Sequence, residues 1–365
     1  MAGSDGLIRS TQSVENNSLT LVTGAAGWLG QNVVEAALEG IAEHPALRDP
    51  PQNRRLRCLV LPGQGRPLLE RWGERIEWVE GDLRNPEVCQ RFCQNARGAV
   101  LLHLAGIIHP GKVAEFYQIN LEATQSLLSA AASAGVKRAV VMSSNSPLGC
   151  NPFREHLFDE ESAYNPYMHY GRSKMQMELA VRERQKRGEI ETVLIRAPWF
   201  YGPHQPARQG LFFRMIRDGK IPIVGDGQNR RSMAYTGNLA QGVLLASDNP
   251  SAAGQIYWIA DDRAYSMNEI IDTVERLLET EFGEVCAHKR IRLPGIFSDL
   301  AWVADKSLQS LGLYHQKIHV LSEMNKTIAC SVAKAKRELG YLPAVALEEG
   351  MRRSLSWMRS VGQWL

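Results

Sequence analysis

A glycine-rich turn near the start of the chain constrains its fold more than any other stretch. The run Leu19–Thr23 is β-prone, Gly24-Ala-Ala-Gly27-Trp-Leu-Gly30 follows it, and residues 31–38 have helical composition. A strand that turns through glycines into a helix lets the backbone approach a diphosphate, and the helix N-terminus offers it N–H donors. We therefore predict a nucleotide-binding turn here, the plainer alternative being a glycine turn without a ligand.

Strand-like and helical segments then alternate as far as residue 196. β-prone segments are predicted at residues 56–61, 76–79, 99–104, 138–142 and 192–196, and helices at 114–134 and 168–187. Segment 99–104 is almost wholly apolar, which is typical of a strand buried on both faces, so His103 within it is predicted to be a core residue. The alternation predicts an α/β fold with a doubly wound parallel sheet over residues 19–196, with 232–262 added.

The alternation of strand-like and helical segments ends after Arg196. The following residues are rich in Pro, Gly, Arg and aromatic side chains, and helices are predicted at 211–218, 267–278, 299–311, 331–339 and 347–357. We expect residues 197–231 and 263–365 to form a smaller substrate-binding domain that covers the strand ends. Residues 1–18 are polar and Ser/Asn-rich, which predicts a flexible N-terminal tail.

Composition excludes several classes of function. A net charge of +3 over 365 residues, without a Lys/Arg block, argues against nucleic-acid binding. No apolar run approaches the ~20 residues of a membrane span, and no apolar signal core begins the chain. The six cysteines have neither disulfide-framework nor zinc spacing, so no metal site is predicted. These features together predict a cytoplasmic protein with a small-molecule substrate.

Tyr170 and Lys174 are the first pair of residues that could carry chemistry. They lie four residues apart in a segment of good helix formers, and so on one face of a helix. A free phenol has a pKa near ~10. A neighbouring ammonium lowers that pKa and would make the tyrosine an acid/base for a substrate hydroxyl. The alternative is a solvated helix face that carries this spacing by chance.

Several motifs occur together and in a fixed order. They are Thr23-Gly24-x-x-Gly27-x-x-Gly30, Gly81-Asp82-Leu83, His103-Leu104-Ala105-Gly106, Asn120, Ser143-Ser144, Tyr170-x-x-x-Lys174, Arg196 with Tyr201-Gly202-Pro203, and the tail 333–343. In this order they resemble the extended short-chain dehydrogenase/reductase superfamily, in its NAD-dependent epimerase/dehydratase branch, over nearly all of residues 19–357. The resemblance implies a Rossmann-type fold with a smaller C-terminal domain, an NAD(P)-dependent enzyme and a homodimer.

The resemblance also implies roles for individual residues. Those implied to bind the cofactor are Gly24, Gly27, Trp28, Leu29, Gly30, Asp82, Leu83, Leu104, Ala105, Gly106, Tyr170 and Lys174. Those implied in catalysis are Ser144, Tyr170, Lys174 and Asn120. In this family the tyrosine takes a proton from a secondary alcohol while hydride leaves for the nicotinamide, and the lysine lowers the pKa of the tyrosine. Ser144 is the expected partner of the substrate hydroxyl, with Ser143 as the alternative.

The sequence alone identifies neither the cofactor, NAD or NADP, nor the substrate. Leu61-Pro62-Gly63 ends the second strand without the acidic residue that would select NAD, so NADP remains possible although the family favours NAD. Asn145 and Ser146 follow Ser144 where sugar-nucleotide dehydratases of this family carry Asp-Glu, so dehydration is not expected.

Two substrate classes remain. A nucleotide-sugar epimerase is favoured by Arg231, which falls where such enzymes bind a diphosphate, and Arg208 could assist it. Ser144 and Asn145 are further candidate substrate-binding residues. A dehydrogenase of the 3β-hydroxysteroid type is favoured by Trp199, where nucleotide-sugar enzymes carry Asn, and by the helical insert 294–324. Trp199 could line an apolar pocket or pack in the core, and both arginines could be solvated charges. A third, weaker alternative is an NAD(P)-binding sensor without catalysis.

Overall fold

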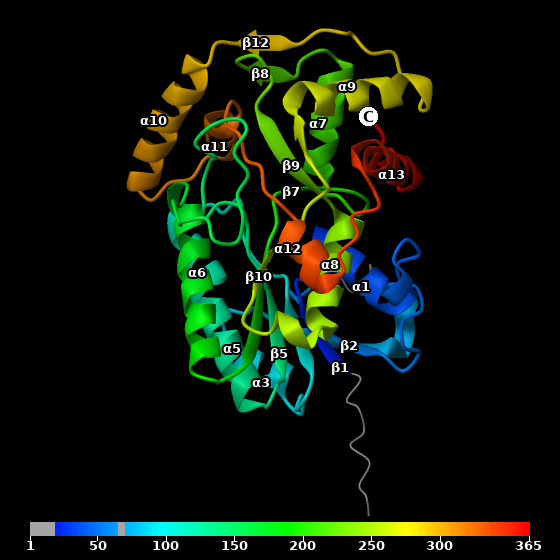
Figure 1. Cartoon of the computed structure of the whole chain (residues 1–365), viewed down its shortest axis with the longest axis vertical. Coiled ribbons are helices and arrows are strands. Elements are labelled where there is room, and N and C mark those ends of the chain that lie inside the picture. Colours follow the sequence, from blue (N-terminus) through cyan, green and yellow to red (C-terminus); the bar gives the residue numbers. More distant parts are fainter. Residues whose placement is uncertain (1–18, 65–69) are drawn as a thin grey trace, which may run out of the picture.

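A large parallel sheet forms the centre of the molecule. The computed structural model describes residues 19–64 and 70–365, so the predicted tail 1–18 lies outside the described part of the chain. Seven strands pair in the order β10-β6-β5-β4-β1-β2-β3 (Figure 1). They are β1 (Leu19–Thr23), β2 (Arg55–Val60), β3 (Ile76–Glu80), β4 (Val100–His103), β5 (Arg138–Met142), β6 (Glu191–Arg196) and β10 (Ile256–Trp258). All pairs are parallel, which confirms the predicted doubly wound sheet.

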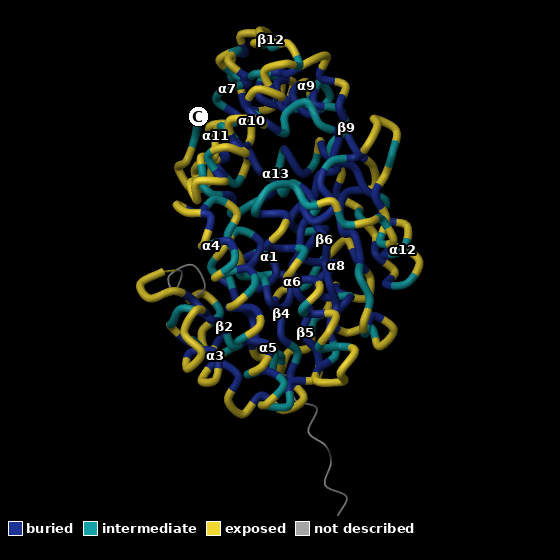
Figure 2. Tube along the Cα trace, turned by 90° about the vertical axis from the view of Figure 1, so that its left-hand side faces the viewer, coloured by how far each residue is buried: buried dark blue, intermediate teal, exposed yellow. Residues whose placement is uncertain are grey.

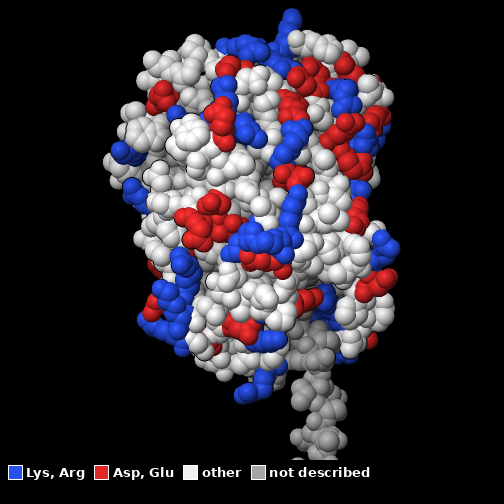
Figure 3. Space-filling view, in the orientation of Figure 1, with Lys and Arg blue, Asp and Glu red and all other residues white. Residues whose placement is uncertain are grey.

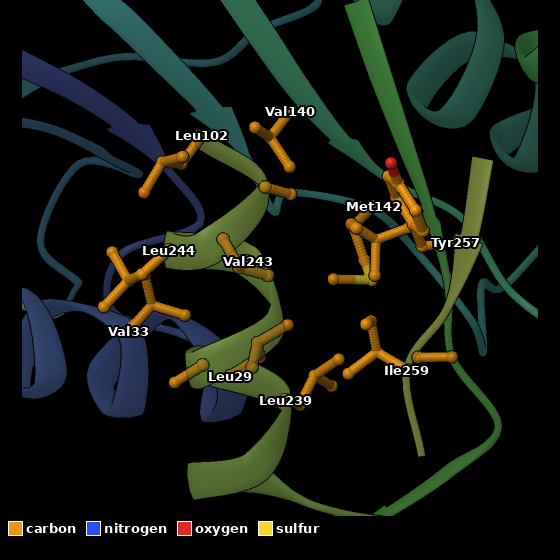
Figure 4. Packing of buried hydrophobic residues seen from close by; sticks show 14 of the residues in the cluster. Leu29, Val33, Leu102, Val140, Met142, Leu239, Val243, Leu244, Tyr257 and Ile259 are labelled. Carbon is orange, nitrogen blue, oxygen red and sulfur yellow. The ribbon is translucent and has the colours of Figure 1, made fainter. Parts of the chain in front are cut away.

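Helices cover both faces of this sheet because neighbouring side chains of a strand point to opposite sides. Leu102 and Val140 belong to one apolar cluster, together with side chains of the helices α1 and α8 (Figure 4). Leu101 and Val141 belong to the cluster on the other face, with α3, α5 and α6. These helices are α1 (Trp28–Glu39), α8 (Thr236–Asp248), α3 (Pro86–Cys93), α5 (Ala123–Ser133) and α6 (Met168–Lys186).

The helix predicted at 114–134 is interrupted. It consists of α4 (Val113–Tyr117), a π-helical turn over Gln118–Glu122 and α5. The extra residue in a π turn changes which side chains face inward, and such turns occur often at functional sites. Asn120 lies in this turn and is buried.

The remaining residues build a smaller region above the carboxyl ends of the strands (Figure 1). Its elements are β7 (Trp199–Tyr201), β8 (Pro222–Val224), β9 (Arg230–Tyr235), β11 (Ala264–Ser266), β12 (Ile291–Leu293), α7 (Ala207–Arg217), α9 (Met267–Thr280) and α13 (Leu347–Ser360). A third apolar cluster fills it. Short 3₁₀ turns lie at Pro45–Leu47, Glu70–Arg75 and Pro250–Ala252.

Two parts of the C-terminal half pack outside this third cluster. The helix α12 (Ala333–Leu339) adds Ala335 and Leu339 to the core of the large sheet. The helices α10 (Ile296–Ser310) and α11 (Gln316–Glu323) form a hairpin beside the start of α6. In Figure 2 the buried trace runs continuously from the lower part of the molecule into the upper part. The division of the chain into a cofactor domain and a substrate domain therefore remains a proposal about function.

Candidate active site

The glycine turn packs closely against the loop after β4. Gly24 has φ +70, and a Cβ there would lie 2.8 Å from the backbone nitrogen of Ala105. The N–H of Gly27 donates to the carbonyl of Gly24 over 2.9 Å, and α1 begins at the next residue. Because a side chain at Gly24 would collide with the neighbouring loop, this position needs glycine, and the start of α1 beside it suits a bound diphosphate.

The side chains of Trp28 and Leu29, which follow the turn, make contacts within the fold. The indole Nε1 of Trp28 donates to the carbonyls of Gly202 (3.3 Å) and Pro203 (2.9 Å), which follow β7. Leu29 is buried in the core beneath α1. Trp28 therefore joins the turn to the smaller region.

Asp82 and Leu83 follow β3 at the carboxyl edge of the sheet. Leu83 is buried, whereas Asp82 is half-exposed. The Arg84 guanidinium donates to the Asp82 carboxylate over 2.9 Å and holds the pKa of Asp82 below its usual value. The structure thus has an ionised carboxylate at one of the positions that the resemblance implies for cofactor binding.

The loop after β4 brings three predicted residues together. Leu104 and Ala105 are half-buried there. A Cβ on Gly106 would lie 3.1 Å from Oδ1 of Asn120 and 3.4 Å from Nζ of Lys174. Asn120 binds the same loop twice, since its Nδ2 donates to the Ile107 carbonyl (3.0 Å) and its Oδ1 accepts from the Ile107 N–H (2.9 Å). Asn120 therefore fixes the loop that faces Lys174.

Tyr170 lies in the first turn of α6, buried against Phe116 with ring centroids 5.6 Å apart. Burial raises the pKa of its hydroxyl to about 12, and a hydrogen bond with the Ser144 side chain opposes that rise. The hydroxyl of Tyr170 is therefore held in its protonated form here, and a lowering of its pKa by Lys174 stays a prediction. Desolvation of the phenolate outweighs the other influences on the hydroxyl.

Lys174 is also buried, and its ammonium group points along the end of β5. Nζ donates to the carbonyl of Met142 over 2.9 Å. Burial lowers the pKa of Lys174 to about 8, and the charge of Glu178 opposes that change. The ammonium is thus held beside Gly106 by a backbone carbonyl.

The two candidate serines have different partners. Ser143 Oγ donates to Glu178 over 2.5 Å, and the same carboxylate pairs with Arg196 (2.7 Å) and accepts from Tyr164 (2.7 Å). Ser144 Oγ lies 3.3 Å from Oδ1 of Asn145. Ser143 is therefore committed to a buried ion-pair network, and Ser144 is the serine beside Tyr170.

Glu178 is a residue that the sequence analysis missed. It is completely buried and joins α6 to the ends of β5 and β6 through Ser143 and Arg196. Tyr170, Lys174 and Glu178 follow one another at intervals of four residues, which places them on one face of a helix. This spacing could have identified Glu178 from the sequence. His103 is a core residue as predicted, hydrogen-bonded to Thr23 (2.7 Å) and Thr124 (2.8 Å).

The predicted substrate residues are more dispersed. Arg231 lies on β9, its Nη2 donates to the carbonyl of Glu323 (2.5 Å), and its buried Nε has no hydrogen bond to a described residue. Arg208 is exposed on α7, and its charge helps to lower the pKa of His109 to about 4, although burial is the larger cause. Trp199 is half-buried against Phe212, with ring centroids 5.5 Å apart.

Aromatic side chains that sequence reasoning did not single out surround Tyr170. Tyr314, in the turn between α10 and α11, packs edge-on against Phe116 (5.4 Å) and its hydroxyl lies 2.8 Å from Nδ1 of His109. The charge of Glu323 also acts on Tyr170, in the direction that raises its pKa. No local pattern marks these residues, because the α10–α11 hairpin brings them to the site from far along the chain.

The described residues form no metal site and no membrane-spanning helix. Over residues 19–64 and 70–365, no three His, Cys, Asp or Glu side chains gather as metal ligands. No helix in this same part of the chain is long and apolar enough to cross a membrane. All six cysteines are unpaired, and Cys89 and Cys93 are buried.

Comparison with known proteins agrees with the geometry. The model of the NAD dependent epimerase/dehydratase family matches residues 20–260. An uncharacterised protein of Sinorhizobium fredii, y4nL, is 52% identical over 95% of this chain and 97% of its own length. The N-acetyl-alpha-D-glucosaminyl-diphospho-ditrans,octacis-undecaprenol 4-epimerase of Escherichia coli O157:H7 is 25% identical over 76% of this chain and 82% of its own.

Two further proteins cover most of the chain. The 3beta-hydroxysteroid-dehydrogenase/decarboxylase isoform 1 of Arabidopsis thaliana is 26% identical over 93% of this chain and 80% of its own length. The solved structure of DesIV, a dTDP-glucose 4,6-dehydratase from Streptomyces venezuelae with NAD bound, covers 95% of this chain and 98% of its own, with a TM-score of 0.73 and 24% identity. The chain therefore belongs to the NAD-dependent epimerase/dehydratase family.

Proposed function

We propose that this chain oxidises and re-reduces a secondary alcohol of a sugar carried on a diphosphate, as a nucleotide-sugar or related sugar epimerase. One observation carries the proposal. Tyr170 is hydrogen-bonded to the Ser144 side chain, which follows β5, and Gly106 lies against Lys174 in the loop after β4, next to the glycine turn. An acid/base, a hydroxyl partner and a cation are thus grouped where this fold binds a dinucleotide.

The residues present fit a nicotinamide dinucleotide. Gly24, Gly27 and Gly30 would hold its diphosphate, since a Cβ on Gly24 would collide with the backbone of Ala105 and move the turn out of place. Gly106 leaves the corresponding space in front of Asn120 and Lys174. When bound, the nicotinamide supplies the acceptor and donor of hydride. Neither feature selects between NAD and NADP.

The proton is handled by this chain's own side chains. Tyr170 would take the proton of the substrate hydroxyl when that carbon is oxidised, and would return it when the ketone is reduced from the other face. Its pKa of about 12 favours the protonated form, which suits the reductive step. The hydrogen bond with Ser144 lowers the pKa of Tyr170 and so favours the phenolate, which the oxidative step needs. In that step the Ser144 hydroxyl would also stabilise the substrate oxygen.

Arg231 supports a diphosphate on the substrate. Its buried Nε lacks a partner among the described residues, although an unpaired buried donor is costly. A guanidinium binds phosphate oxygens with two N–H groups at once. One relative with a related sequence acts, by its name, on a sugar diphosphate, which agrees with this assignment.

A dehydrogenase acting on an apolar alcohol is the second candidate. Phe116 and Tyr314 place aromatic surface next to Tyr170, and such surfaces bind apolar ligands. The relative named as a hydroxysteroid dehydrogenase is about as similar as the sugar epimerase. A sensor without catalysis has no specific support, because both Tyr170 and Lys174 are present.

The first experiment is to denature the purified protein and identify the released nucleotides by mass spectrometry. An epimerase regenerates its cofactor in place, so we expect retained NAD(P), with or without a nucleotide sugar. A protein that is empty as purified and exchanges NAD(P) freely would contradict the epimerase and favour the second candidate.

A further inference from the structure

The helix α10 has its polar side toward the protein and its apolar side toward solvent. Ser298 and Asp305 are completely buried and Gln309 is only 3% exposed. Ile296 (60%), Leu300 (59%) and Val303 (54%) are exposed on the opposite side, and Phe297 (44%) lies beside them. A helix that packs on a water-soluble protein normally shows the reverse arrangement. We call Ile296, Phe297, Leu300 and Val303 the outer face of α10.

Hydrogen bonds fix this orientation. Ser298 Oγ donates to the carbonyl of Leu321 (2.7 Å), and the Asp305 carboxylate binds His319 (2.7 Å) and the Gln309 side chain (2.9 Å). Turning α10 about its axis would bury apolar side chains but leave these polar groups unpaired in the interior, at a larger cost. The exposure of the outer face is therefore a built feature of the hairpin.

The apolar surface continues beyond the helix. Leu311 (75%) and Leu313 (50%) follow in the turn, and the Trp302 ring (37%) lies at the margin. Space-filling atoms on the side of the molecule that α10 occupies are mostly uncharged (Figure 3). Large exposed apolar side chains gathered on one face of a helix mark an interaction surface.

Basic side chains border the patch. Lys306 lies over the Trp302 ring at 4.9 Å, and Lys317 is exposed on α11. Neither lysine forms an ion pair within residues 19–64 and 70–365. The one exposed acid of α10, Asp299, is neutralised by Lys326 at 3.1 Å. The border is therefore net positive.

We propose that the outer face of α10 docks on an anionic lipid membrane, with the helix lying in the plane of the interface. Large apolar residues with a tryptophan and lysines at their edge are the composition of interfacial helices, and the lysines would meet the lipid phosphates. A second copy of the chain fits less well, because a twofold contact through this face would bring the same lysines together.

The proposed contact would place the active site near the membrane. On the inner side of the hairpin, Gln309 accepts from the N–H of His169 (3.1 Å), the residue before Tyr170, and Ser322 binds the Tyr167 hydroxyl (2.7 Å). The hairpin therefore separates the lipid surface from the segment that carries the acid/base. The membrane contact does not depend on the proposed sugar chemistry.

Sedimentation of the full chain with vesicles tests the proposal. We expect it to pellet with vesicles of phosphatidylcholine containing phosphatidylglycerol, and more weakly with phosphatidylcholine alone. The double substitution Leu300→Glu and Val303→Glu should reduce the bound fraction at least tenfold. Lys306→Gln should weaken binding about fivefold and only on the anionic vesicles. Val285→Glu, at a position 89% exposed in another loop, is the matched control and should bind as the parent does.

Three results would overturn the proposal. One is a parent chain that stays in the supernatant with both kinds of vesicle. Another is a control variant that loses binding as much as the double variant does. The third combines two observations: the parent does not bind vesicles, and light scattering without lipid shows a dimer that the double substitution disrupts. That result would assign the outer face of α10 to a contact with a second copy of the chain. Thermal unfolding at the parent temperature would show that the double variant is folded.

Discussion

Three ionisable residues of α6 repeat every fourth position, and each has its own surroundings. Tyr170 meets Ser144, Lys174 meets the Met142 carbonyl, and Glu178 binds Ser143 and Arg196. The first two were predicted from the spacing. The role of Glu178 could not be, because its partners come from other strands that the sequence does not place in space. Its network holds the end of β5, and so fixes which serine faces the acid/base.

Replacing Tyr170 with Phe tests the proposed acid/base. The variant keeps the ring and its contact with Phe116, so folding and NAD(P) binding should change little. Turnover should fall below detection, because no other hydroxyl in reach has the same partners. Steady-state rates, a cofactor titration and the melting temperature measure these three properties. Full activity in this variant would remove the proposed mechanism.

The two serines predict opposite phenotypes. Ser144→Ala should lower kcat by about 10²- to 10³-fold while the melting temperature stays near the parent value. Ser143→Ala removes a donor to a buried carboxylate and should cost about 2 kcal/mol in the free energy of unfolding, with a smaller loss of kcat. Chemical denaturation and kinetics of both variants compare them directly. The reverse pattern would make Ser143 the substrate's partner.

Arg231→Ala separates the two candidate substrates. If the substrate carries a diphosphate, KM should rise about 100-fold or more, because a charge-assisted contact is lost. Arg231→Lys is the control variant. It keeps the positive charge and a donor for the Glu323 carbonyl, but it lacks the planar group that binds a phosphate with two N–H groups. An unchanged KM in the alanine variant would favour the apolar alcohol.

At the scale of elements, the sequence predicted the type and order of the helices and strands better than it predicted which side of a helix faces the protein. Strands β1 and β5 have the predicted bounds, and β2, β3, β4 and β6 differ by one residue at one or both ends. The π turn at Gln118–Glu122 was missed, because no residue preference distinguishes it from α-helix. The segment 299–311 was predicted as a helix, but its inward polar face depends on His319 and His169, which are distant in sequence.

Asp261 links elements of both regions and predicts a pH effect. Its carboxylate accepts from Tyr201 (2.5 Å), the Tyr235 N–H (3.0 Å) and Asn238 (3.3 Å), and burial raises its pKa to about 7. Between the unfolded pKa of ~4 and 7, the folded state holds a proton that the unfolded state has lost. Asp261 therefore stabilises the fold less as pH rises through this window.

Asp261→Asn isolates this effect, because an amide can keep both N–H contacts and donate to Tyr201. We expect the free energy of unfolding of the parent, relative to the variant, to fall by about 2 to 4 kcal/mol from pH 4.5 to pH 7.5. Urea denaturation at several pH values measures the difference, in which the titrating histidines cancel. A difference independent of pH would mean that Asp261 is ionised throughout.

At the scale of the whole molecule, the two regions share contacts that neither could make alone. Trp28, beside the glycine turn, binds carbonyls of the loop after β7, and Arg353 of α13 pairs with Glu43 (2.8 Å) after α1. Leu339 and Tyr341, near the C-terminus, belong to the core of the large sheet. These contacts predict that the chain unfolds as one unit.

Calorimetry with and without NAD(P) tests this cooperativity. A ligand that binds only the folded state stabilises it by about 2.7 kcal/mol at 100 times Kd. For a chain of 365 residues that corresponds to a rise of roughly 3 to 4 °C in Tm. Because the glycine turn is joined to the smaller region through Trp28, we expect one transition that moves as a whole. Two transitions, of which only one moves with cofactor, would show that the regions unfold independently.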